Sequence, residues 1–122
     1  MGDSGPGPFQ AYGALQMTVT GSPPGVAIGG EIDPATYDAL VRKLTEVARG
    51  CDQVHVDLSA VEYCDVAGLR AVVRLAAPGR TVVLHGLPVP LLTLLSILGW
   101  DTTPGLVIKD SPSAASPNGS RP

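Results

Sequence analysis

The sequence has 122 residues, of which 44% are hydrophobic and 16% charged, with a formal net charge of −3 at pH 7. Eight Lys and Arg against eleven Asp and Glu, with one Phe, one Trp and three Tyr, argue against a domain that neutralises nucleic-acid phosphates or stacks bases. There is no leader-like N-terminus and no apolar run of about 18 residues, so we expect a soluble, cytoplasmic protein without membrane insertion.

Glycine, proline and serine dominate both ends of the chain. Residues 1–13 and 111–122 show no apolar period and too few large apolar side chains to form a core. We therefore predict disordered tails over these two segments and one folded domain over residues 14–110.

The first half of this domain predicts a hairpin and a helix. Apolar and polar residues alternate over residues 15–20, and a second apolar strand over 26–32 follows a Gly- and Pro-rich turn. Asp33 then has the position of an N-cap, and a helix with apolar residues at helical spacing is predicted from Pro34 through Arg49.

The second half alternates between strands and helices. Predicted strands at 53–58, 81–85 and 106–109 are separated by predicted helices at 66–76 and 91–98. Because helical crossovers force strands to run parallel, the order predicts an α/β fold. We expect a single small domain with a mixed, mostly parallel sheet of about five strands and about three helices.

Two segments together carry a family resemblance. Residues 56–69 read VDLSAVEYCDVAGL, a strand ending in Asp-Leu-Ser that leads into a helix, and residues 30–33 read GEID before the first predicted helix. This combination resembles the STAS domains, the family of anti-sigma-factor antagonists, over residues 15–109. The resemblance implies a non-enzymatic protein-binding domain without cofactor or metal. The family's usual final helix has no counterpart in the pattern after the last strand.

The resemblance breaks at the family's regulatory residue. STAS antagonists carry a serine or threonine immediately before the glycine of the motif, where a partner kinase phosphorylates it. Here that position is Ala67, and the preceding residue is Val66, so neither has a hydroxyl. A phosphate would add nearly two negative charges beside Asp65 and Glu62 and would expel a docked partner. We therefore expect a docking surface that cannot be switched at this position.

The resemblance also implies where a partner binds. The expected contact surface consists of Gly30, Glu31, Asp33, Tyr63, Asp65, Val66, Ala67 and Gly68. The expected partner is an anti-sigma-factor serine kinase or a related partner-switching protein, and apolar surface left by the missing final helix could also support a homodimer. One alternative is a STAS scaffold or ligand-binding subunit of another multi-protein sensor or lipid-transport assembly. Another is that residues 65–68 are only a capped helix start.

Other chemistry has weaker support. Asp57 at a strand end resembles a phospho-accepting aspartate, and Lys109 could accompany it, but the acidic pair that would hold Mg²⁺ is absent from the first strand. His55 and His85 could meet Asp57 at a metal, but two histidines without a further His or a Cys pair favour polar strand residues instead. Ser59 lacks the sequence context of a catalytic nucleophile.

The cysteines and two of the arginines complete the candidates. Cys51 and Cys64 lie at opposite ends of a predicted strand, about 20 Å apart, which predicts free thiols. We expect Cys64 to be a buried packing residue rather than a reactive one. Arg70 and Arg74 are one helical turn apart, which indicates a solvated face or a contact with an acidic partner.

Overall fold

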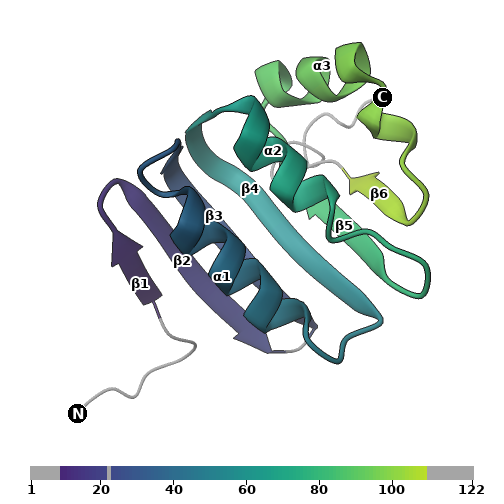
Figure 1. Cartoon of the computed structure of the whole chain (residues 1–122), viewed down its shortest axis with the longest axis horizontal. Coiled ribbons are helices and arrows are strands. Elements are labelled where there is room, and N and C mark those ends of the chain that lie inside the picture. The colour runs from purple at the N-terminus through teal and green to yellow at the C-terminus, as the bar shows by residue number, and fades with distance from the viewer. Residues whose placement is uncertain (1–8, 22, 110–122) are drawn as a thin grey trace, which may run out of the picture.

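The computed structural model describes residues 9–21 and 23–109 (Figure 1). They form one six-stranded sheet, three α-helices and a short 3₁₀ turn, and the strand order in the sheet follows the order in the chain. The strands are β1 (Phe9–Tyr12), β2 (Leu15–Gly21), β3 (Pro24–Ile32), β4 (Gln53–Cys64), β5 (Thr81–His85) and β6 (Leu106–Lys109). The helices are α1 (Tyr37–Ala48), α2 (Val66–Val73) and α3 (Val89–Leu98), and the 3₁₀ turn η1 is Trp100–Thr102.

The α/β class and the mixed sheet are confirmed. β1, β2 and β3 pair antiparallel, and β3, β4, β5 and β6 pair parallel. Each parallel pair is connected through a helix, and α1 and α2 lie side by side on the same face of the sheet (Figure 1). This placement follows because each crossover has the same hand and moves the chain one strand further in the same direction.

Two segments differ from the sequence prediction at the N-terminal side. Residues 9–12, expected to belong to a tail, form the edge strand β1, because Gly13 adopts a φ of 61° and closes a two-residue turn onto β2. This strand raises the number from the expected five to six. The expectations for residues 111–122, and for the absence of a final helix, lie outside the described residues.

Three other element boundaries differ from the prediction by three residues or more. β4 continues six residues beyond the predicted Leu58, because register shifts between β3 and β4 let the strand bend and remain paired to Cys64. α2 ends at Val73 rather than Ala76, where the backbone tightens and Leu75 and Ala76 donate to the carbonyls three residues earlier. α1 starts at Tyr37 rather than Pro34, for a reason given below.

The core lies between the sheet and the helices. Val54, Val56 and Leu58 of β4 are at most 1% exposed, because every second residue up to Leu58 points to this side. Beyond the register shift with β3 the next buried residue is Val61. Leu40 of α1 and Leu69 of α2, both 0% exposed, pack on these residues of β4. Burial of each such side chain stabilises the fold by about 1.5–3 kcal/mol. None of the described helices is long and apolar enough to cross a bilayer.

Small and polar residues occupy the opposite face of the sheet. The strand registers align Thr18, Ala27, Asp57, His85 and Lys109 in one row across five strands. The helices α1 and α2 both pack on the core face of the sheet and not on the face that carries this row. Side chains in the row therefore contact water, which favours small and polar residues. The alternation of polar residues in the sequence therefore reflects a sheet with one face covered by α1 and α2, and a second face, called the open face below, that neither of these helices covers.

Two histidines meet on this open face. Nδ1 of His55 lies 2.8 Å from Nε2 of His85, with ring centroids 5.0 Å apart and planes inclined by 19°. The rings therefore lie edge to edge, and one N–H donates to the lone pair of the other ring. No group of three side chains able to hold a metal gathers within residues 9–21 and 23–109. The pair is a hydrogen bond between strands.

The pKa of His85 is lowered from its ordinary value of 6.5. Burial disfavours the imidazolium most, the charge of His55 and then of Lys109 lowers the pKa further, and Asp57 opposes them.

This shift predicts a pH-dependent stability. Because the unfolded chain binds a proton at His85 more readily than the folded chain, the free energy of unfolding should fall as the pH drops below about 6.5. Urea unfolding of the wild type and of His85→Gln, each at about pH 7.5 and about pH 5.5, should show a larger loss for the wild type. An equal loss in both proteins would contradict the assignment.

Candidate partner-binding site

The centre of the candidate site is the junction between β4 and the start of α2. Asp65 adopts an extended conformation as the N-cap of α2, and its Oδ1 accepts a hydrogen bond of 2.8 Å from the backbone N–H of Gly68. Its carbonyl accepts from the N–H of Leu69 at 3.0 Å. The predicted cap is therefore present, and it typically stabilises a helix by about 1 kcal/mol.

Gly68 is needed for close packing rather than for its backbone angles. It is buried in the first turn of α2 and lies directly against the end of β3. A Cβ at this position would overlap Cγ2 of Ile32 and would come within 3.1 Å of Oδ1 of Asp65. A larger residue would thus push the helix start away from the sheet and disturb the cap at the same time.

The structure brings the two predicted segments together through β3 and β4. Glu31 pairs with Tyr63 in the parallel register, and the N–H of Asp65 donates to the carbonyl of Ile32 at 3.0 Å. Gly30 has a φ of 85°, and a Cβ there would overlap the carbonyl oxygen of Ala14. Residues about thirty positions apart in the chain therefore lie next to each other where β3 and β4 end.

Asp33 caps a turn before α1 and is not the predicted N-cap of the helix. Its Oδ1 accepts from the N–H groups of Ala35 at 2.9 Å and Thr36 at 3.1 Å, which closes a turn between β3 and α1. The Thr36 hydroxyl, in turn, donates to the carbonyl of Glu31 at 3.1 Å. The α-helical bonds begin only with Leu40 N–H to Thr36, so the prediction of a helix from Pro34 is wrong by one turn.

The outer surface of this junction is apolar and exposed. Tyr63 is 55% exposed and Val66 is 45% exposed, while Ala67, which follows Val66, is half-buried. Large apolar side chains are costly to leave in water when they lie together, which is typical of interaction surfaces. The side chains of Glu31 and Glu62 are exposed at the same end of the sheet.

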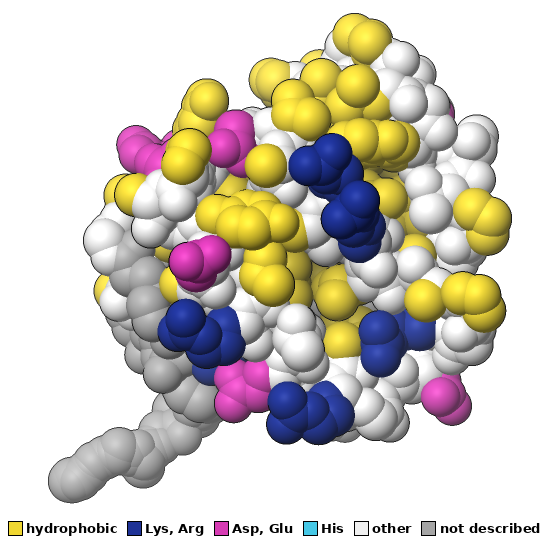
Figure 2. Space-filling model, viewed as in Figure 1, with side chains coloured by type: hydrophobic (Ala, Val, Ile, Leu, Met, Phe, Trp, Pro, Cys, Tyr) yellow, Lys and Arg dark blue, Asp and Glu magenta, His cyan; other side chains and the backbone are white. Residues whose placement is uncertain are grey.

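The helix α3 also contributes to this surface, although the family motif did not indicate it. Val89 is 72% exposed and Leu92 42% exposed, and apolar side chains cover the upper part of the molecule around this helix (Figure 2). Between the start of α3 and the end of β4 lies a hollow of about 240 Å³, whose walls include Tyr63, Pro88 and Leu94. The signal was present in residues 89–98, which have only two polar side chains among ten.

Cys64 lines this hollow without offering a reactive thiolate. Burial, with a smaller contribution from the charge of Asp65, raises the pKa of its thiol to about 12. The thiol donates a weak hydrogen bond to the carbonyl of Asp65 at 3.4 Å and stays protonated at neutral pH. Cys51 and Cys64 are both free, as predicted.

Comparisons with known proteins identify the fold. The sequence profile of the family described as "Mlab, STAS domain" matches residues 15–108. No curated protein matches the chain.

Similar solved structures include an anti-sigma factor antagonist from Mycobacterium paratuberculosis, with 23% identity over 80% of this chain and 88% of that one, and a TM-score of 0.68. The unphosphorylated anti-sigma factor antagonist SpoIIAA has 15% identity over 83% of this chain and 92% of that one, with a TM-score of 0.59. A complex of the diguanylate cyclase SiaD with its activator SiaC from Pseudomonas aeruginosa has 11% identity over 83% of this chain and 95% of that one, with a TM-score of 0.54. At these identities the three structures share the fold with this chain.

The packing of Gly68 predicts the cost of a single methyl group. Gly68→Ala should lower the free energy of unfolding by about 1–3 kcal/mol, because its Cβ overlaps Ile32. Gly21→Ala is the matched control, since a Cβ there meets nothing within 4 Å, and its effect should stay within about 0.5 kcal/mol. Urea denaturation measures both, and equal stabilities of the two variants would refute the packing argument.

Proposed function

This chain is a member of the STAS domain family, and we propose that it is a non-enzymatic, cytoplasmic regulatory domain that binds a protein partner. The partner is an anti-sigma-factor serine kinase or a related partner-switching protein. The contact is made by the start of α2 together with the β3–α1 turn. The observation that carries this proposal is that Tyr63 at the end of β4 and Val66 beside Ala67 at the start of α2 are exposed apolar side chains, at a helix start fixed by the Asp65 cap.

Pre-organisation of the helix start favours the binding of a partner. Asp65 and Gly68 tie the helix start to β3, so the exposed side chains lose little conformational freedom when a partner binds. Ala67 is small, which lets a partner's backbone approach the helix closely. Tyrosine is one of the residue types enriched among those that dominate binding energy, and Val66 adds apolar contact area beside Tyr63.

The absence of a hydroxyl at residue 67 makes this surface permanent. Neither of two other hydroxyl groups is a suitable substitute as a phosphate acceptor. Thr36 is only 5% exposed, and its hydroxyl is hydrogen-bonded within the turn that precedes α1. Ser59 is exposed but lies on β4, away from the helix start. We propose a constitutive binding domain whose partner is released by something other than a phosphate on this helix.

A second candidate is a STAS scaffold subunit of another multi-protein assembly, such as a sensor or lipid-transport complex. The same observation favours it, because a surface that cannot be switched at Ala67 suits a subunit that stays bound. Recovery of a membrane transport complex with the tagged chain from its native cells would favour this candidate. Recovery of a kinase-like anti-sigma factor would favour the first.

A charge at residue 67 should weaken the interaction. We expect Ala67→Glu to reduce partner affinity by more than about 1 kcal/mol, because the carboxylate would be desolvated in the interface. The control is Ala60→Glu, which places the same charge at an exposed position on the open face of the sheet. Calorimetry with the purified partner measures both, and equal affinities would move the interface elsewhere.

A phosphorylation assay tests whether the surface around Ala67 can be modified by the partner kinase. Incubation with the partner kinase and ATP should leave the mass of the wild type unchanged, whereas Ala67→Ser should gain the mass of one phosphate. Intact-mass spectrometry distinguishes the two results. A phosphate on Ser59 or Thr36 of the wild type would contradict the proposal.

A further inference from the structure

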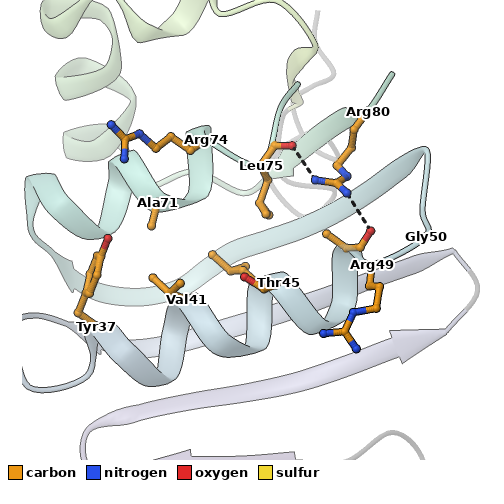
Figure 3. A pocket seen from close by; sticks show the side chains of 11 residues that line it. Tyr37, Val41, Thr45, Arg49, Gly50, Ala71, Arg74, Leu75 and Arg80 are labelled. Carbon is orange, nitrogen blue, oxygen red and sulfur yellow. Dashed lines mark hydrogen bonds between the residues drawn. The ribbon is translucent and has the colours of Figure 1, made fainter. Parts of the chain in front are cut away.

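A groove of about 530 Å³ runs between α1 and α2 on the outer side of the molecule (Figure 3). Its floor consists of apolar side chains, of which Leu44 and Ala48 are 2% exposed and Leu75 is 9% exposed. Tyr37 stands at one end, and Val41 forms part of the wall along α1 (Figure 3). The size and apolar floor are typical of a binding site rather than of a gap between side chains.

The groove exists because the two helices differ in length and α2 has a small residue where it faces α1. α1 has twelve residues and α2 has eight, so the last turns of α1 extend beyond the end of α2. Ala71 occupies the middle of the α2 wall, where a larger side chain would fill the space. Arg80, which precedes β5, reaches into the end of the groove (Figure 3).

The guanidinium group of Arg80 donates hydrogen bonds to three backbone carbonyl groups. Its Nη2 donates to Ala48 at 3.3 Å, its Nη1 to Leu75 at 3.5 Å and its Nε to Cys51 at 3.3 Å. These carbonyls lie at or just beyond the C-terminal ends of α1 and α2, where helices leave acceptors unpaired and where a cation is favourable. Arg80 therefore joins the ends of the two helices and places a positive charge in the groove.

The groove is positively charged in a protein of negative net charge. Arg49 and Arg74 line it together with Arg80, and no Asp or Glu lines it. Within residues 9–21 and 23–109 the only ion pair is Lys43 with Glu46, so none of these three guanidinium groups is paired with a described carboxylate. Arg49 and Arg74, neither of which has an ion-pair partner among the described residues, and Arg80 at the end of the groove give the apolar floor a positively charged rim. Such a rim complements an acidic, partly apolar ligand.

We propose that this groove binds an acidic amphipathic segment of the partner protein. Arg74 and Arg49 extend from opposite walls and point away from each other, so they do not converge on one headgroup (Figure 3). Such a spread suits several carboxylates along a peptide better than the single anionic group of a small amphiphile. The apolar side of the segment lies on Val41 and Ala71.

The groove continues the surface already proposed for partner binding. Ala67 and Ala71 of α2 and the C-cap residue Arg74 follow one another at helical spacings of four and three residues, so they share one side of the helix. A partner that covers Ala67 can therefore extend directly into the groove. This inference rests on the proposed function and names the chemistry of the partner that occupies the rest of α2.

The test uses the full chain and two synthetic helical peptides with the same leucine stripe, one carrying glutamates and the other lysines at the flanking positions. Fluorescence anisotropy measures affinity, and amide chemical-shift changes locate the contact. The glutamate peptide should bind with shifts centred on Val41, Thr45 and Ala71, more weakly as salt is added, and the lysine peptide should not bind. Binding of both peptides, or of neither, would overturn the proposal.

Variants test the role of the arginines. Arg49→Gln combined with Arg74→Gln should weaken binding of the glutamate peptide about tenfold. The matched control combines Arg42→Gln with Arg70→Gln, one exposed arginine from each helix that does not line the groove. Equal weakening by both pairs would show a general charge effect and refute the groove. Thermal unfolding verifies that each variant is folded.

Two further outcomes separate this inference from its alternatives. Displacement of the glutamate peptide by dodecanoate at lower concentration, with the same shifts, would assign the groove to an anionic amphiphile and overturn the proposal. Loss of the partner on Ala67→Glu, without any preference for the glutamate peptide, would retain the proposed function and reject the groove. A preference for the glutamate peptide, with partner affinity unchanged by Ala67→Glu, would retain the groove and reject the contact at residue 67.

Discussion

The close approach of Gly68 to Ile32 fixes the position of α2 on the sheet. It brings the first turn of α2 onto the end of β3, and only a residue without a side chain fits there. The Asp65 cap and the hydrogen bond from Asp65 to Ile32 then hold the helix start in one orientation. The exposed residues at the junction, and the wall that α2 offers to the groove, take their positions from this contact.

The periodic parts of the fold could be predicted from the sequence. The strands at 81–85 and 106–109 agree residue by residue, because short apolar runs between glycines and prolines leave little choice of boundary. The start of α1 could not be predicted, since Asp33 caps an isolated turn as readily as a helix. The continuation of β4 depends on register shifts with β3, which are set by tertiary packing.

The same distinction holds for the candidate site. The cap at Asp65 and the position of Ala67 are local features that the motif shows directly. The pairing of Glu31 with Tyr63 requires knowledge of which strands are neighbours and of their register. The groove could not be predicted from the sequence, because it results from the difference in length between α1 and α2 and from the direction in which Arg80 extends.

The agreement between strand order and chain order has a consequence for how the molecule forms. Each described strand after β1 pairs with the strand that precedes it in the sequence, so each of these pairings closes a loop no longer than one crossover. Short loops cost little entropy, and sheets built from neighbouring segments fold faster than those that join distant ones. During synthesis each new strand can therefore add to an edge that already exists, and the domain can grow from its N-terminal hairpin as the chain emerges.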